Sequence, residues 1–510
     1  MVFRSILPSC FKAIFPKEKA ILYLVLFCLI NSACIKKINL YQGDKDDDNN
    51  GNKIKVEEVV SETDFFYPFE KETKYVETTM TIHVRNKLPD DTQKLQVEIP
   101  PLKYNKSWLF MLTQDDCKQA AFCCTWAAIN GRPLSDSYFY DLAHVQADDF
   151  PPDIHYLGKT LGCTDGAGNE VRFSFTTTLS PEWNYMNETT KVGKGYTEND
   201  YRFFMKSGLI WGNVKEMLNY GISIAYHDLK LDDNKSETDV LTHLELARNI
   251  ILDKLNRDCK MLARPDGNNT HINAGMQYTP IKTMTMEAGG IKLYPHQNMD
   301  LYKVPIERSF YNPSTGDTRT NPERIKEAIL SELAKPENER SAIYAGVHST
   351  DRSWVEFFQW LNDEYGKEGL DNMWMPSQEE YYEYAYFRRQ GIIVPRKIDD
   401  YTLEVTVALP CEDAFYYPSV TVNLSGLEMK DISSIDTDEN ITGLSYADCK
   451  AKNCVMLNID CRKYLAEHAE NFVKRYEANP TKVSAKADAN YFVDMLKDSD
   501  KKTELKKRAE

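Results

Sequence analysis

Short apolar segments alternate with helical patterns between residues 104 and 395, and this alternation restricts the possible folds more than any other feature of the chain. Residues 108–113 and 342–347 are apolar runs of the length of a buried strand. Residues 237–255 place apolar side chains on one helix face, at Val240, Leu244, Ala247, Ile251 and Leu255. Such alternation predicts a parallel sheet or barrel, with functional residues at the carboxyl ends of the strands.

Both flanks of this region show the two-residue period of β-strands. Apolar and polar side chains alternate in residues 61–101 and again in residues 396–460, so we expect an N-terminal β element and a C-terminal β-sandwich-like module. Residues 461–510 are charged and are predicted to form a helix whose last residues fray. The predicted fold class is therefore α/β, a parallel sheet or barrel over residues 102–395 that is flanked by β modules at both ends.

One part of the predicted barrel domain lacks the alternating pattern. Residues 130–210 are rich in Gly, Asp, Asn and Thr, which is typical of loops. We expect them to form an insertion beside the site, with a hairpin at residues 171–177.

The N-terminus has the organisation of a secretory signal. A basic segment, a short apolar run and the small residues Ser-Ala precede Cys34. The small residues before a Cys resemble a lipobox, although Asn31 departs from its usual pattern. We therefore expect residues 1–33 to be a lipoprotein signal peptide and the lipidated Cys34 to anchor the chain in the cell envelope, on the periplasmic or cell-surface face of the outer membrane. The alternative is an uncleaved signal anchor. Residues 34–60, acidic and without a substantial apolar run, are predicted to be a flexible tether.

The composition excludes one class of partner and leaves another open. A formal net charge of −15 argues against nucleic acid as a partner. The chain also contains 30 Tyr and 7 Trp, and aromatic rings can pack against sugar faces. Core packing is the alternative role for most of them. The candidates for glycan contact are Trp183, Trp211, Trp354 and Trp374.

Nine cysteines follow Cys34 in the sequence. Export would permit disulfides, and an odd number leaves at least one thiol unpaired. The candidate disulfide partners are Cys411, Cys449, Cys454 and Cys461.

Polar residues follow predicted strands or helices at four places in the chain, where a functional site is expected. Asp115 and Asp116 follow the first apolar run, and His227 ends a strand that follows a helix stopped by Gly221. Arg264 follows the long helix, and His348 ends the strand at residues 342–347. Successive side chains of a strand point in opposite directions, so we expect the two carboxylates to diverge, one to ligate a metal and the other to remain free as a base.

These residues resemble the motifs of NodB-type polysaccharide deacetylases, a carbohydrate esterase family. Thr113-Gln-Asp115-Asp116 matches the family's Thr-x-Asp-Asp motif, and His227 matches the start of its second motif. The segment Arg264-Pro-Asp-Gly is similar to the third, and His348 takes the place of the last histidine. The resemblance covers roughly residues 104–390 and implies a distorted (β/α) barrel of deacetylase type.

The resemblance also implies a role for each residue. Asp116 and His227 would ligate a divalent metal, most simply Zn²⁺, which lowers the pKa of water and polarises a carbonyl. Asp115 would be the general base, and Arg264 would hold it ionised through a direct contact. His348 would protonate the leaving group.

The sequence departs from the family at the second motif, where Leu231 stands in place of a second histidine. His243 is the candidate for the third ligand, with His271 and Asp228 as alternatives. A packed or surface role is the alternative for His243 itself. The third motif also lacks its aromatic residue. The predicted function is metal-dependent deacetylation of an acetylated glycan by an exported lipoprotein. The alternative is a catalytically inactive lipoprotein of the same fold that binds glycan.

Overall fold

The structure is a computed structural model that describes residues 75–188, 192, 199–204 and 208–510. The predicted signal peptide, Cys34 and the acidic tether lie outside the described residues. Among the helices that are described, none combines the length and apolar character needed to span a bilayer.

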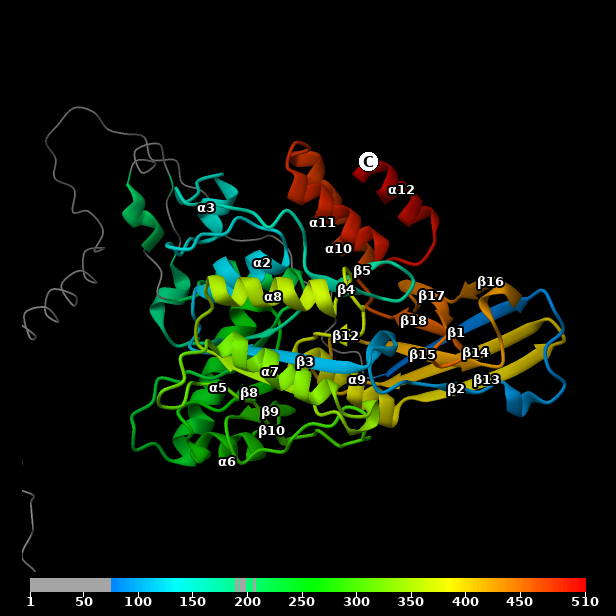
Figure 1. Ribbon diagram of the computed structural model, residues 1–510, viewed down its shortest axis with the longest axis horizontal. Coiled ribbons are helices and arrows are strands. Elements are labelled where there is room, and N and C mark those ends of the chain that lie inside the picture. The colour runs from blue at the N-terminus through cyan, green and yellow to red at the C-terminus, as the bar shows by residue number, and fades with distance from the viewer. Residues whose placement is uncertain (1–74, 189–191, 193–198, 205–207) are drawn as a thin grey trace, which may run out of the picture. The chain divides into compact units, whose positions relative to one another are not determined.

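Seven parallel strands form a nearly closed barrel, in which strands that follow each other along the chain lie next to each other in the sheet. Figure 1 labels β3, β8, β9 and β10 of this barrel among its helices. The strands are β3 (Trp108–Gln114), β6 (Thr176–Leu179), β7 (Ser223–Tyr226), β8 (Met261–Ala263), β9 (Thr283–Met286), β10 (Pro305–Glu307) and β11 (Ile343–Val347). β11 pairs with β3, and Ser309, just after β10, closes the ring through backbone hydrogen bonds to Tyr344 and Gly346, each 2.9 Å long. A short strand, β12 (Met373–Trp374), adds to the start of β3. The predicted distorted (β/α) barrel is confirmed.

Helices between the strands cover the barrel. They are α4 (Trp211–Asn219), α5 (Glu237–Leu255), α6 (Asn269–Gln277), α7 (Asn321–Leu333), α8 (Arg352–Glu364) and α9 (Gln378–Gln390). The longest, α5, starts at a capping box in which Ser236 and Asp239 bond each other's backbone N–H. It buries the five apolar residues of its predicted face and ends at Asn256 in a left-handed conformation.

The predicted insertion contains a barrel strand that the sequence pattern did not reveal. The hairpin lies earlier than expected, between β4 (Gly162–Thr164) and β5 (Glu170–Arg172). β6, with the sequence Thr-Thr-Thr-Leu, is buried along its whole length and lies between β3 and β7. Two of its three hydroxyl groups have partners inside the protein: Thr176 Oγ1 lies 2.9 Å from Ser223 Oγ, and Thr178 Oγ1 accepts a hydrogen bond of 3.4 Å from Cys117 N. A buried strand without an apolar run gives no hydropathy signal.

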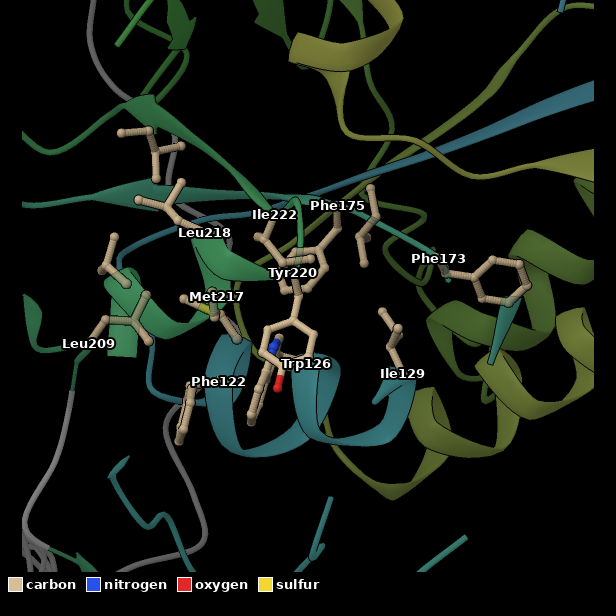
Figure 2. Packing of buried hydrophobic residues seen from close by; sticks show 14 of the residues in the cluster. Phe122, Trp126, Ile129, Phe173, Phe175, Leu209, Met217, Leu218, Tyr220 and Ile222 are labelled. Carbon is tan, nitrogen blue, oxygen red and sulfur yellow. The ribbon is translucent and has the colours of Figure 1, made fainter. Parts of the chain in front are cut away.

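An aromatic cluster joins the segment after β3 to the next barrel helix (Figure 2). A π-helix, η3 (Ala121–Trp126), continues into the short helices α2 (Ala127–Ile129) and, further on, α3 (Leu142–Gln146). Phe122 and Trp126 stack with ring centroids 4.7 Å apart, and Tyr220 meets Trp126 edge-on at 5.3 Å. These residues are buried and fix the start of the insertion against α4.

The β segments before and after the barrel in sequence form one module of two four-stranded sheets. β1 (Tyr75–Val84) lies between β14 and β16, and β2 (Val97–Glu98) pairs with β15. The other strands are β13 (Ile392–Asp399), β14 (Thr402–Pro410), β15 (Ser419–Ser425), β16 (Ile432–Thr437), β17 (Gly443–Cys449) and β18 (Cys454–Asp460). The sequence pattern treats the two ends as separate modules because period-two alternation shows that a strand exists and does not show its partner.

The C-terminus forms three packed helices, α10 (Leu465–Ala478), α11 (Val483–Asp494) and α12 (Asp500–Ala509). The last helix is anchored, because Leu505 and Ala509 are fully buried. Phe472 of α10 stacks on Phe492 of α11 at 4.0 Å. The single charged helix with a frayed end that we expected is therefore replaced by a small helical layer.

Asp488 of α11 ties this helical layer to the barrel domain. It forms ion pairs with Arg132 and Arg172, and Tyr220 donates a hydrogen bond of 2.7 Å to it. Burial alone would raise the pKa of Asp488, but the two guanidinium groups outweigh burial and hold the pKa below its ordinary value.

Replacing Asp488 by Ala should leave two buried guanidinium groups without their shared partner. We expect a loss of about 3–5 kcal/mol in the free energy of unfolding, measured by urea denaturation. Asp494→Ala on the same helix is the matched control, because Asp494 pairs with Lys506 near the surface and should cost less than about 1 kcal/mol. Equal losses for the two variants would contradict the role assigned to Asp488.

Candidate active site

Each of the seven barrel strands is followed by a polar residue at its carboxyl end. These residues are Asp115 and Asp116 after β3, Ser180 after β6, His227 and Asp228 after β7, Arg264 after β8, Glu287 after β9, Arg308 after β10 and His348 after β11. The carboxyl edge of a parallel barrel is where its loops gather functional groups.

The turn after β3 brings its two carboxylates together. Asp116 has a φ of 59° and Cys117 a φ of 48°, so the chain turns sharply as soon as the strand ends. Asp tolerates this left-handed conformation better than most residues. Asp115 Oδ2 and Asp116 Oδ1 then lie 3.9 and 3.5 Å from the Nε2 atom of His227. The expectation that the two side chains diverge was wrong, because it assumed that β3 continues through both.

His227 is buried and held by its other ring nitrogen. Nδ1 lies 3.0 Å from the carbonyl oxygen of Ala263, which can only accept a hydrogen bond, so Nδ1 carries a proton and Nε2 faces the carboxylates. Burial by itself lowers the pKa of His227. The charge of Asp115 and the hydrogen bond to Asp116 outweigh burial and raise the pKa to about 9.

The pKa of Asp116 is shifted in the opposite direction, below its ordinary value. Its hydrogen bond to His227 outweighs the effect of partial burial and, with the nearby charges of His348 and Lys118, lowers the pKa of Asp116 to about 2. The site therefore surrounds one imidazole with negative charge, an environment that favours a cation.

Asp228 completes a group of three potential metal ligands. Ligand atoms of Asp116, His227 and Asp228 all lie within 4.8 Å of one another. Ser180 donates a hydrogen bond of 2.6 Å to Asp228 Oδ2 and orients the carboxylate. Burial, together with the neighbouring carboxylates of Asp116 and Asp115, raises the pKa of Asp228. Two carboxylates and one imidazole are a donor set that suits Zn²⁺ and other divalent ions.

The other two histidine candidates do not join this group. His243, on α5, places Nδ1 2.6 Å from Glu182 Oε2. His271, on α6, is buried, and its Nδ1 has no hydrogen-bond partner in the described part of the chain. Burial lowers the pKa of His271 to about 4, and the nearby positive charges of Lys235 and His227 act in the same direction. The geometry thus favours Asp228, one of the sequence alternatives, over His243.

Arg308, which the sequence analysis missed, makes the contact expected from Arg264. Its Nη1 donates to Asp115 Oδ1 at 2.7 Å, and its Nη2 donates to Glu287 Oε1 at 3.0 Å. Arg264 instead bonds the other oxygen of Glu287, at 2.6 and 2.9 Å. The physical reason is position: Arg308 follows β10 and is fully buried between the two carboxylates. β10 spans only three residues, too short a strand to be recognised from hydropathy.

His348 lies at the exposed rim of the site. Its ring stacks on Phe310, with centroids 4.8 Å apart and an interplanar angle of 27°. The stack leaves the polar edge of the ring available to a bound molecule.

The chain belongs to the family described as putative polysaccharide deacetylase, which matches residues 78–510. The family resemblance drawn from the motifs is thereby confirmed. No curated protein matches the chain significantly.

Two solved structures are similar to part of the chain. One is the Xyl-CE4 domain of a multidomain xylanase from the hindgut metagenome of Trinervitermes trinervoides, 12% identical, with a TM-score of 0.25 over 54% of this chain and 90% of that one. The other is a mutant of the peptidoglycan deacetylase PdaC from Bacillus subtilis, 12% identical, with a TM-score of 0.27 over 57% of this chain and 96% of that one.

The ligand group can be tested by titrating Zn²⁺ into apoprotein in a calorimeter. Asp228→Ala removes one of the three potential ligands and should weaken binding by about 100-fold or more, whereas His243→Ala should leave it within about twofold of the wild type. Each substitution removes one potential metal ligand, Asp228 inside the ligand group and His243 outside it. The reverse order of effects would assign the third ligand to His243.

Proposed function

We propose that the protein removes acetyl groups from an acetylated glycan in a metal-dependent hydrolysis. The main support for the proposal is that two groups of residues lie side by side at the carboxyl edge of the barrel. A buried carboxylate held by an arginine, Asp115 with Arg308, lies beside the potential ligands Asp116, His227 and Asp228. The family match supports the substrate class.

Asp116, His227 and Asp228 would hold the metal, with Nδ1 of His227 fixed by Ala263 and Asp228 fixed by Ser180. When bound, a divalent ion such as Zn²⁺ lowers the pKa of water and polarises an acyl carbonyl. The negative surroundings of His227 support this assignment, because a cation would offset three neighbouring carboxylates.

Asp115 would act as the general base. Arg308 occupies its Oδ1 atom, so Oδ2, the oxygen that faces His227, is left to accept the proton of the attacking water. The water oxygen bonds to the acetyl carbon, and the bond from that carbon to the sugar nitrogen or oxygen then breaks. The fixed position of Asp115 supports this role, because a general base must be held within hydrogen-bond reach of its proton.

His348 would protonate the departing amine or alcohol. It lies on the exposed rim, where the stack on Phe310 restricts its ring. Acetate and the free amine or hydroxyl of the sugar are the products, so every proton taken by Asp115 is matched by one given by His348.

Acetate release from a panel of N-acetylated and O-acetylated oligosaccharides tests this proposal. We expect the zinc-loaded wild type to release acetate and Asp115→Asn to lower kcat by about 10²–10⁴-fold, because the variant keeps the shape of the base and loses its proton affinity. His243→Ala is the control and should retain activity. If the wild type binds an oligosaccharide but releases no acetate with any divalent metal, the protein is a glycan-binding member of the fold.

The proposal also includes the cellular location of the protein. We infer that the chain is exported and anchored in the cell envelope through a lipidated Cys34, because a signal-like segment and a small-residue pair precede that cysteine. Cys34→Ser should move the protein from the membrane fraction to the soluble fraction. Continued membrane association of the Cys34→Ser protein would favour an uncleaved signal anchor.

A further inference from the structure

The hairpin of β17 and β18 places two cysteines directly opposite each other. Seven residue pairs join the strands, from Gly443 opposite Asp460 to Cys449 opposite Cys454. The cysteine pair is the last pair before the turn at residues 450–453. Partners in an antiparallel ladder direct their side chains to the same face of the sheet, so the two sulfur atoms share one face at the closed end of the hairpin.

The backbone of this hairpin already has the dimensions of a disulfide. Directly opposed residues in antiparallel strands have Cα atoms about 4.5–5.5 Å apart, within the range of about 4.4–6.8 Å that a disulfide requires. The turn is fixed by a hydrogen bond of 3.1 Å from Lys452 N to Cys449 O and by Asn453 in a left-handed conformation, with a φ of 52°. A bond between the two sulfur atoms therefore needs no change of register.

Cys449 differs from the other described cysteines in its exposure to solvent. Of the nine cysteines that the structure describes, eight are buried and Cys449 is partly exposed. Burial and the proximity of Cys449 raise the pKa of Cys454 to about 12. Cys449 is thus the thiol that an oxidant reaches, and Cys454 is the thiol positioned to resolve the intermediate.

We propose that Cys449 and Cys454 are a redox modification site, at which the folded protein forms a disulfide with a disulfide-bearing oxidant. The thiolate of Cys449 attacks the oxidant's disulfide, and one thiol of the oxidant leaves. The sulfur of Cys454 then displaces the second thiol and forms the bond to Cys449. The two cysteines lose two protons and two electrons, and the disulfide of the oxidant gains them as two thiols.

The bond would secure the edge of a sheet. β17 is the outer strand in the order β17-β18-β15-β2, so only β18 holds it through strand pairing. The turn already joins the two strands at that end, and a disulfide beside it would fix the pairing of their last residues and limit fraying of the outer strand. Cys411 and Cys461, the other two cysteines singled out by the sequence, are both buried and are not paired in any described strand ladder.

Peptide mapping tests the disulfide directly, because the turn contains two tryptic sites. Cleavage after Lys450 and Lys452 places Cys449 on residues 431–450 and Cys454 on residues 453–462. Folded protein is incubated with oxidised glutathione, denatured with an alkylating agent, digested and analysed by mass spectrometry without reduction. We expect the two peptides to be joined, and to separate when a reductant is added.

An internal control is present, because the peptide of residues 453–462 also contains Cys461. In the joined species Cys461 should be alkylated, which shows that the link is made by Cys454. Cys449→Ser and Cys454→Ser should each abolish the joined peptide, whereas Cys163→Ser should preserve it. Two separate, fully alkylated peptides from the wild type would overturn the proposal, as would Cys454 joined to any other cysteine. The result is independent of deacetylation, which is measured by acetate release.

Discussion

The buried ion pair between Arg308 and Asp115 is the interaction on which the arrangement of the site depends. Both side chains are almost fully excluded from solvent and lie 2.7 Å apart. Attraction between such charges is strong in a protein interior, and the loss of either partner leaves an uncompensated charge that costs about 3–5 kcal/mol. Through its second nitrogen Arg308 also bonds Glu287, which in turn bonds Arg264. One guanidinium group therefore connects the ends of β3, β9 and β10 and leaves one oxygen of Asp115 facing His227.

Much of the barrel was predictable because its longer elements have an unambiguous period. The five buried residues of α5 and the apolar runs of β3 and β11 show their structure within a single window of sequence. Strands of three residues, such as β8 and β10, contain too few positions to establish a period. β6 was missed for a different reason: its threonines are buried, and the hydrogen bond between Thr176 and Ser223 forms only when the barrel brings β6 beside β7.

The residues of the site also fall into those that the sequence revealed and those that it did not. Asp115, Asp116 and His227 were identified because each follows a strand that the sequence reveals, and the structure brings them together. Arg308 was missed because β10 was missed, and the two residues it joins are 193 and 21 positions away in sequence. The convergence of Asp115 and Asp116 depends on the left-handed conformation of Asp116, the second residue after β3, which strand periodicity does not encode. Local patterns therefore identified candidate side chains, and the closure of the barrel decided which of them meet.

Anomalous X-ray diffraction from crystals grown or soaked with Zn²⁺ tests the central claim most directly, because the signal locates the metal without reference to activity. The account predicts one strong peak at the carboxyl edge of the barrel, bounded by Asp116, His227 and Asp228, with Asp115 still paired to Arg308 beside it. A peak at His243 and Glu182, or ordered density for the site with no peak at the three ligands, would contradict it.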